Sequence, residues 1–330
     1  MPPNWNLLGH TWAVELLKGH LQRGAPRHAY LFTGPQGVGR RTLALRFAQA
    51  LNAENSAQPG DIDPEHIRSQ QIERMQHPDL FVVERQEGDR DIKVDAVRAL
   101  QHSLALAPYE APYRVALLRD FEHASNSAQN AMLKTLEEPP GRVVLLVTAE
   151  SAEALLPTIT SRCEVLRLRP LALDIVSQGL QEQWGLPVEQ AELLAHISGG
   201  RPGYALHLHN NPEILEARST WLDEQQGLLA APRRTRFDYA EGLAKDKDSL
   251  QAVLLVWLSF WRDVLLRTAQ AAAPLANPDR AAEIDQLSQH LDLNRAKAVV
   301  AAIERTLGLL KSNANARLAT EVLLLDLPSP

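Results

Sequence analysis

A glycine-rich segment near the N-terminus has the residue types that bind phosphate. Gly34, Gly37 and Gly39 follow a short apolar run at residues 29–33 and precede a helical pattern at 42–51. In that setting, glycine lets backbone N–H groups surround a phosphate at the positive N-terminus of a helix. The spacing of Gly34 and Gly39 matches the Walker A pattern G-x-x-x-x-G-K-[ST]. We interpret the segment as a vestigial phosphate loop; a plain glycine turn into a helix is the alternative.

The two chemically active positions of that pattern are altered. Arg40 stands where the lysine should be, and Arg41 stands where a hydroxyl should bind Mg²⁺. A guanidinium can touch phosphate, but it does not reproduce a compact ammonium and offers no oxygen to a metal. Thr42 comes one residue too late and would face elsewhere on the helix. The loop therefore predicts a degenerate ATP site with no bound ATP or Mg²⁺ as a working cofactor.

The acidic half of such a site is altered in the same way. An apolar run at residues 115–118 leads into Arg119 and Asp120. In the Walker B pattern the first of these positions is an acid that holds Mg²⁺, so Arg119 places a cation where a cation must bind. Asp120 falls at the position of the catalytic glutamate, with a shorter side chain. The alternative, an ordinary core strand that ends in a solvated Arg-Asp pair, also predicts no catalysis.

Alternating strand and helix patterns surround these motifs. Strands are predicted at residues 29–33, 80–84, 115–118, 143–148 and 164–168, the last alternating and nearer an edge. Helices are predicted between them at 42–51, 93–106, 126–136 and 152–157. Strands that alternate with helices favour a five-stranded parallel sheet with helices on both faces. The first half is therefore predicted to be an α/β P-loop-type domain.

Strand patterns stop after residue 170. Two short helices are predicted at 174–184 and 187–197, followed by a glycine-rich break at 199–203. Longer helices are predicted at 211–229, 236–245, 249–273, 280–289, 293–311 and 314–327. Residues 54–64 are polar and predict a surface loop. We predict an α/β domain at 1–170, a small helical lid at 171–208 and an all-helical domain at 209–330.

Composition excludes several classes of protein. Cys163 is the only cysteine, so an intramolecular disulfide or a multi-thiolate zinc site is impossible. The net charge of −6 does not suit a chain that binds DNA over its whole surface. No run looks like a membrane span, and the first residues lack the features of a secretory signal. A cytoplasmic protein without membrane partners is expected.

At this point the sequence resembles a known family, the bacterial clamp-loader ATPase subunits of DNA polymerase III. The resemblance rests on HAYLF at 28–32, the glycine-rich loop, NAMLKTLEEPP at 130–140, SRC at 161–163, WLSFWRDVLLR at 257–267 and NANARLATE at 313–321. It covers nearly the whole chain and implies the AAA+ fold with a helical lid and a C-terminal collar for oligomerisation. In that family the motor subunits keep intact ATP motifs, whereas delta-prime subunits commonly carry degraded ones. This sequence resembles the second group.

The resemblance gives Arg162 a specific role. In the family, the arginine of Ser-Arg-Cys lies at a subunit interface and reaches the ATP held by the neighbouring subunit. A planar, permanently charged guanidinium suits that task, because it stabilises the charge that spreads over a transferring phosphoryl group. The alternative is an arginine that caps a strand and pairs with a surface carboxylate. We predict that Arg162 is an arginine finger that acts in trans.

Other family positions point to lost chemistry. Thr148 matches the polar residue that senses the γ-phosphate, although an ordinary strand-end threonine fits equally well. The phosphate-sensing arginine of the lid would fall at Gly203, with Arg201 two residues out of register. The family's four-cysteine zinc module would fall at residues 52–77, where His66 and His77 alone do not make a site. No zinc is therefore expected.

Three functions compete at this stage. The first is a non-hydrolysing stator that presents Arg162 to a neighbour and works with gamma/tau and delta subunits, and through them with the sliding clamp and primed DNA. The second is a motor subunit that hydrolyses ATP with Arg40 as a substitute lysine. The third is a direct DNA-binding module, which the negative charge and the absence of a basic–aromatic stripe disfavour. Three altered positions, Arg40, Arg119 and Gly203, favour the stator.

Overall fold

A computed structural model describes residues 4–54, 58–312 and 314–328. The chain divides into two compact units, one of residues 1–184 with 200–204 and the other of 185–199 with 205–330. The three-domain division at residues 170 and 208 stays a prediction. The start of the chain, part of the loop predicted at 54–64, and Asn313 of the collar motif lie outside the described residues.

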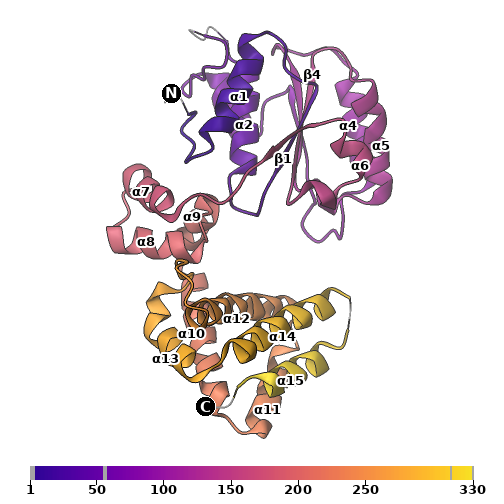
Figure 1. Cartoon of the computed structure of the whole chain (residues 1–330). Helices are drawn as coiled ribbons and strands as arrows, with labels where there is room; N and C mark the ends of the chain where they lie inside the picture. Colours follow the sequence, from indigo (N-terminus) through magenta and orange to yellow (C-terminus); the bar gives the residue numbers. More distant parts are fainter. Residues whose placement is uncertain (1–3, 55–57, 313, 329–330) are drawn as a thin grey trace. The chain divides into compact units, whose positions relative to one another are not determined.

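The first unit contains a parallel sheet with helices on both faces (Figure 1). The strands are β1 (Ala29–Thr33), β2 (Leu80–Val83), β3 (Arg114–Leu118), β4 (Val143–Ala149) and β5 (Glu164–Arg167). Their order is β2-β3-β4-β1-β5, and every pair is parallel. The five-stranded α/β prediction is confirmed, and β5 lies at an edge as its alternating pattern indicated.

Two apolar layers bury the faces of this sheet. On one face, α1 (Thr11–Gln22) and α2 (Arg40–Leu51) cover side chains such as Tyr30 and Phe32. On the other, α4 (Val94–Leu104), α5 (Asn126–Glu137) and the short α6 (Pro157–Thr160) cover Leu31 and Val147. Strands buried on both faces read as continuous apolar runs, which is why the sequence located them.

Several helices differ from their predicted bounds. The unit also contains α1 and α3 (Ile67–Glu73), which were not predicted. The predicted helix at 152–157 was wrong: a 3₁₀ turn, η2 (Ala152–Ala154), is followed by α6, which begins at Pro157. Proline lacks an N–H and has a helical φ, so it suits the first turn of a helix and here opens one. Ser125 accepts the N–H of Ala128 and fixes the start of α5.

The rest of the described chain consists of helices joined by loops. The helices are α7 (Leu173–Trp184), α8 (Val188–Ile197), α9 (Pro202–Asn210), α10 (Pro212–Ala230), α11 (Arg233–Leu243), α12 (Lys247–Thr268), η3 (Pro278–Arg280), α13 (Ala281–His290), α14 (Leu293–Lys311) and α15 (Ala316–Asp326). The first unit includes α7, whereas α8 groups with the second unit. Helix α12 ends at Thr268 rather than at the predicted residue 273, because Gln270 turns into the left-handed region.

Helix α12 organises the core of the second unit. Trp257, Phe260 and Trp261 are fully buried in it, and α12 packs against α10, α13 and α14. Its length and composition would let it cross a membrane, which the sequence survey overlooked, although the central helix of a folded core meets the same criteria. Asp263, buried on the same helix, accepts hydrogen bonds from the N–H groups of Ala276 and Asn277. A buried carboxylate held by backbone donors fits a helix inside a protein core.

Candidate functional site

The glycine-rich loop leaves the carboxyl end of β1 and runs into α2. Gly34, Gly37 and Gly39 have φ angles of 146°, 81° and 113°. Residues other than glycine rarely adopt such positive φ angles. A Cβ on Gly34 would lie 2.4 Å from the carbonyl oxygen of Leu168. Gly39 is the N-cap of α2. The predicted strand–loop–helix arrangement is therefore confirmed, and its glycines are required by the backbone path.

The start of α9 lies directly against this loop. The N–H of Gly203 donates to the carbonyl oxygen of Gly37 at 2.8 Å. A Cβ on Gly37 would come within 2.7 Å of the backbone nitrogen of Tyr204. Arg201 stacks on Tyr204, with its guanidinium carbon 4.5 Å from the ring centre, and donates to the carbonyl of Gln36 at 3.4 Å. Glycine at 203 thus permits a close backbone approach, since a Cβ there would lie 2.9 Å from the carbonyl oxygen of Gly37.

Arg40 is held inside the protein by two carboxylates. Its side chain is only 7% exposed, and Nη2 donates to Oδ1 of Asp120 at 3.0 Å. Nη1 lies 3.8 Å from Oε1 of Glu122. The positive charge that would face a phosphate is therefore already compensated by the two acids that follow β3.

Asp120 itself is fixed by its neighbours. It adopts a left-handed backbone conformation with φ 47°, and its N–H donates to the hydroxyl oxygen of Thr148 at 2.8 Å. The N–H of Glu150 donates to Oε1 of Glu122 at 3.1 Å. Thr148, buried at the end of β4, thus positions the acid that pairs with Arg40. Asp120 and Thr148, both predicted as site residues, are therefore hydrogen-bonded to each other.

Three other predicted residues point away from this pair. Arg41 is exposed, and its Nη2 contacts the sulfur of Met75 at 3.8 Å. Thr42 is exposed on α2, as its late position indicated. Arg119 forms an ion pair with Glu84, the residue that follows β2. The two positions that should supply Mg²⁺ ligands hold guanidinium groups, each engaged with another part of the unit.

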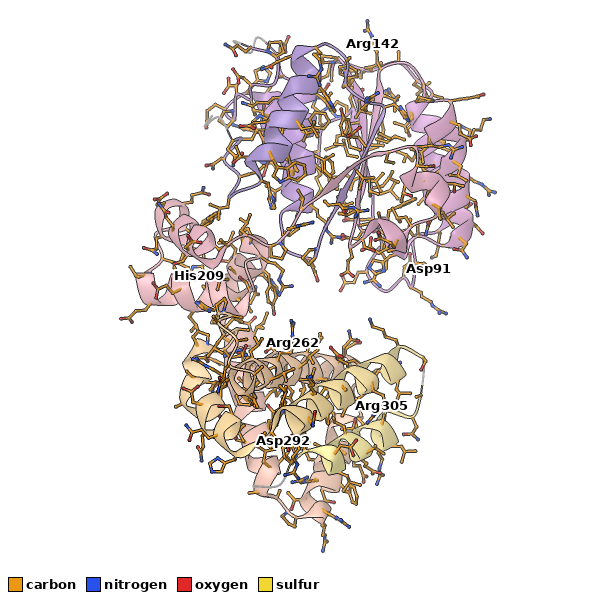
Figure 2. The ribbon with its side chains drawn as sticks, viewed as in Figure 1. Asp91, Arg142, His209, Arg262, Asp292 and Arg305 are labelled. Carbon is orange, nitrogen blue, oxygen red and sulfur yellow. The ribbon has the colours of Figure 1, made fainter. Side chains whose placement is uncertain are left out.

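Arg162 lies at the end of the sheet where the strands begin, whereas the glycine-rich loop lies at the end where they finish. It precedes β5, in which Glu164 is paired with Tyr30 and Arg167 with Thr33. Nη2 donates to Oε1 of Glu137, the last residue of α5, at 2.7 Å, and Nη1 donates to the carbonyl of Thr158 at 2.8 Å. Two labelled residues mark these two ends of the sheet in Figure 2: Arg142 directly precedes β4, and Asp91 lies beyond the carboxyl end of β2.

This placement separates Arg162 from the chain's own phosphate loop. The loop follows the carboxyl end of β1, whereas Arg162 precedes the amino end of the neighbouring parallel strand β5. A strand rises about 3.3 Å per residue, so the four residues of β5 alone span about 13 Å. A phosphoryl group at the loop of the same chain is therefore out of reach of this guanidinium.

Cys163 is not activated as a nucleophile. Burial raises the pKa of its thiol to about 12, so the thiolate is scarce at neutral pH. Within residues 4–54, 58–312 and 314–328, no three His, Cys, Asp or Glu side chains gather as a metal site requires. The absence of zinc remains a prediction about the protein.

Sequence reasoning missed the three acids that hold these arginines. Glu122 follows Asp120 by two residues, Glu84 follows β2, and Glu137 ends α5. Glu84 could have been found, because parallel neighbouring strands bring the residues after β2 and β3 to one edge. Glu122 and Glu137 depend on turn and helix-end geometry, for which the sequence offered no comparable pattern.

Comparison with known proteins finds matches over most of the chain. The family described as DNA polymerase III, delta subunit, matches residues 9–172, and the family described as its C-terminal part matches 212–328. The DNA polymerase III subunit delta-prime of Pseudomonas aeruginosa is 33% identical over 264 residues, which cover 78% of this chain and 77% of that protein. The chain belongs to the DNA polymerase III delta-prime family.

Two further relatives sharpen that assignment. Subunit delta-prime of Bacillus subtilis is 30% identical over 257 residues, which cover 76% of each chain. Subunit tau of Salmonella typhimurium is also 30% identical, but over 178 residues that cover 53% of this chain and 27% of tau. Likeness to delta-prime subunits thus extends into the helical unit, and the resemblance noted in the sequence is confirmed.

Proposed function

We propose that this delta-prime family member is a clamp-loader subunit that does not hydrolyse ATP itself and presents Arg162 to the ATP of a neighbouring subunit. The observation that carries the proposal is the ion pair between Arg40 and Asp120, with Nη2 and Oδ1 3.0 Å apart. In this arrangement Nη2 of Arg40 and Oδ1 of Asp120 are directed toward each other rather than toward a phosphate or a water molecule. Nη1 of Arg40 is buried beside Glu122 without a hydrogen-bond partner, so the ion pair is what opposes a role in catalysis.

The fit of Mg²⁺ and ATP to these residues supports the first half of the proposal. Mg²⁺ prefers oxygen ligands in octahedral geometry, and positions 41 and 119 carry arginines. The start of α9 also lies on the loop, with Gly203 bonded to Gly37. A triphosphate that engaged Arg40 would compete with its ion pair to Asp120. The residues do not suit the group, and we assign them no catalytic step.

The position of Arg162 supports the second half. Its side chain is 34% exposed, it lies away from the loop of its own chain, and its partner Glu137 is 51% exposed. Surface ion pairs of this kind contribute about 0–1 kcal/mol, so a phosphate of another subunit could replace Glu137 at low cost. A guanidinium delivered in this way would stabilise charge that develops on a γ-phosphoryl group.

The helical unit supplies a surface that suits assembly. Leu318, Val322 and Leu325 are exposed on α15 at a spacing that places them on one side of the helix. We assign this stripe to contacts with the collars of gamma/tau and delta subunits. Through that assembly the chain would serve the loading of a sliding clamp onto primed DNA in the cytoplasm. A stator role requires such a surface, since Arg162 acts only when a neighbour is held in place.

Calorimetry of the purified chain with Mg²⁺ and ATP, followed by a hydrolysis assay on the same sample, tests the proposal. The expected result is no Mg²⁺-dependent binding and no turnover. Micromolar binding with turnover would contradict it and would make the chain a motor subunit that uses Arg40 in place of lysine. A known gamma/tau-type motor subunit measured in parallel is the positive control.

A further inference from the structure

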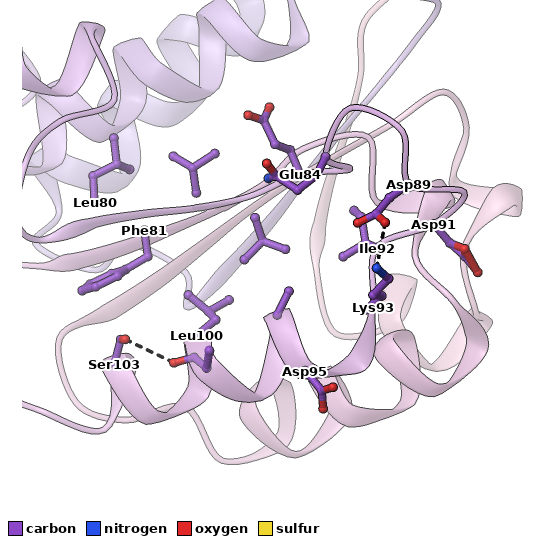
Figure 3. A pocket seen from close by; sticks show the side chains of 15 residues that line it. Leu80, Phe81, Glu84, Asp89, Asp91, Ile92, Lys93, Asp95, Leu100 and Ser103 are labelled. Atoms are coloured by element: carbon purple, nitrogen blue, oxygen red, sulfur yellow. Dashed lines mark hydrogen bonds and ion pairs between the residues drawn. The ribbon is translucent and has the colours of Figure 1, made fainter.

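The outer edge of β2 borders a hollow of about 490 Å³ that the ATP site does not use (Figure 3). The hollow lies between β2 and α4. All four residues of β2 and Glu84 line it from the strand, and Ala96, Ala99, Leu100 and Ser103 line it from the helix. Three of these helix side chains are small. An extended chain could therefore approach the edge of the strand closely.

The backbone of β2 has hydrogen-bonding groups directed toward this hollow. Val115 N–H donates to the carbonyl of Asp79, and Arg119 N–H donates to the carbonyl of Val83. In a parallel ladder the residues that face a neighbour alternate, so Phe81 and Val83 face β3. The N–H and C=O of Val82 then face the open edge. Since β2 ends the strand order, these groups form a template for one more strand.

The two ends of the hollow differ in chemistry. Beyond the carboxyl end of β2, the lining includes four carboxylates, Glu84, Asp89, Asp91 and Asp95, against one ammonium, Lys93. Lys93 is already paired with Asp89 at 2.7 Å, as Figure 3 shows. Two more of these carboxylates are paired with arginines outside the lining, Glu84 with Arg119 and Asp95 with Arg98. Among the described residues that line this end, Asp91 is the carboxylate without an ion pair, and it would attract one basic side chain.

Leu80 and Phe81 line the other end of the hollow, and two exposed apolar side chains lie beyond it. Leu106 and Tyr109 follow α4, and their side chains are 65% and 79% exposed. They lie beside the start of β2, because the N–H of Tyr109 donates to Oδ1 of Asp79 at 2.7 Å, and Asp79 directly precedes the strand. Large exposed apolar side chains at the end of a groove suit an apolar partner.

From these observations we propose that β2 is a docking site for an extended segment of another protein, which adds to the sheet as a sixth strand. The segment has apolar side chains along β2 and arginine or lysine at the end beside Asp91. Strand addition of this kind draws affinity from main-chain hydrogen bonds and specificity from flanking pockets. Antiparallel pairing of two copies of β2 would set Asp91 beside Leu106 and Tyr109, so a second copy would leave the charge of Asp91 without a basic partner.

Two capped heptapeptides serve as probes, VTVTVRR and its reverse RRVTVTV, each with a fluorescent label. They place arginines at the acidic end of β2 for a parallel or an antiparallel added strand. Binding of one of them to the full chain is expected with a Kd on the order of 100 µM by fluorescence anisotropy. Replacement of both arginines by glutamate, or N-methylation of alternate backbone nitrogens, should weaken it at least about tenfold.

Three variants place the binding on β2. Ala99→Arg fills the hollow from an exposed position of α4, Val82→Pro removes an outward N–H while β3 pairing is kept, and Asp91→Lys reverses a charge. Each should weaken peptide binding about tenfold. His102→Arg and Glu87→Lys are matched controls, since neither residue lines the hollow, and they should bind as the parent does. Equal melting temperatures of all five variants would show that they are folded.

Some outcomes would overturn the proposal. Absence of binding by both peptides, or unchanged binding after backbone N-methylation, would exclude strand addition. Equal loss in Ala99→Arg and His102→Arg would place the binding elsewhere. Sedimentation completes the test: a dimer of the parent chain that Ala99→Arg dissociates would mean that a second copy covers β2, contrary to the proposal.

Discussion

Two arginines of the α/β unit each pair with a carboxylate. One lies at the carboxyl ends of the strands and the other at the amino ends. Arg40, after the carboxyl end of β1, is 7% exposed and is held by Asp120, with Glu122 close by. Arg162, before the amino end of β5, is 34% exposed and is held by Glu137. The first pair lies at the N-terminus of α2, directly after the glycine-rich loop. The second leaves its arginine accessible from outside the chain.

The difference between these pairs lies in what it costs to separate them. A buried guanidinium that loses its partner stays desolvated and uncompensated, whereas an exposed one regains water. If the loop has lost its ATP, as we propose, the buried charge of Arg40 needs an internal partner, which Asp120 provides. An arginine that acts on a neighbour has the opposite requirement: its resting partner must be easy to leave.

The largest expected effect follows from replacement of the accessible arginine. In an assembled clamp loader, Arg162→Ala should reduce ATP hydrolysis of the complex by about 10³-fold, because arginine fingers supplied in trans contribute at least that much. The melting temperature of the isolated chain should hardly change, since the Arg162–Glu137 pair is exposed. Steady-state hydrolysis by the complex is the measurement.

The matched control for this change is Arg167→Ala. Arg167 ends β5, is 69% exposed, and lies 3.7 Å from Glu153, so it is another exposed arginine paired with a carboxylate. Loss of hydrolysis in Arg162→Ala alone supports the assignment. A complex that contains Arg162→Ala, assembles normally and retains full hydrolysis would contradict it.

Asp79, a fully buried carboxylate in the same unit, is a reference for the stability lost when a carboxylate shielded from water is replaced. It accepts hydrogen bonds from the N–H groups of Tyr109, Glu110 and Ala111, and Arg114 lies 3.5 Å away. Burial by itself would raise the pKa of Asp79, but these donors and the charge of Arg114 outweigh it and hold the pKa below its ordinary value. Asp79→Asn should lower the free energy of unfolding by about 3 kcal/mol at pH 7.

This loss should depend on pH in a defined direction. Because the pKa of Asp79 is lowered in the folded state, its contribution is fully present above the unfolded value of about 3.9 and is lost as the pH falls through the folded value. Denaturant unfolding of both proteins should therefore differ most above about pH 5 and converge in acid. A difference that grows as the pH falls would contradict the assignment.

Burial and backbone conformation explain which features of the fold could be predicted from the sequence. The strands and the glycine loop were predictable because burial on both faces and positive φ leave marks on residue type at each position. Helix α1 could have been found from its buried Ala13, Val14 and Leu17, which repeat at helical spacing. The prediction of lost chemistry came from Arg40 and Arg119, because a guanidinium at either position does not supply the group that the ATP motifs use.

The pairing of those residues could not be predicted in the same way. The contact between Arg40 and Asp120 depends on the left-handed backbone conformation of Asp120. It also depends on the hydrogen bond from the N–H of Asp120 to the hydroxyl of Thr148, which joins segments far apart in sequence. The approach of Gly203 to Gly37 depends on the path of the chain before α9. A glycine marks such a position as permissive without naming what comes close to it.

Two double-mutant cycles measure the comparison of the pairs directly. Arg40→Met with Asp120→Asn should give a coupling energy of about 1 kcal/mol, limited by the 41% exposure of the Asp120 side chain. Arg162→Met with Glu137→Gln should give about 0–0.5 kcal/mol. Urea unfolding of the four single and two double variants provides both values. Equal coupling in the two cycles would remove the distinction between a committed and an exchangeable pair.

The smallest expected effect comes from an attempt to restore the loop. The double variant Arg40→Lys, Arg41→Thr recreates the Walker A pattern, yet ATP turnover by the isolated chain should stay at background. Arg119 would still place a cation at the metal position, Asp120 would remain free to pair with the new lysine, and Gly203 would still contact Gly37. A triple variant that adds Arg119→Asp separates these causes. Turnover in the double variant would mean that Arg40 and Arg41 alone abolished catalysis, whereas Mg²⁺-dependent binding that first appears in the triple variant would assign the decisive loss to the metal position.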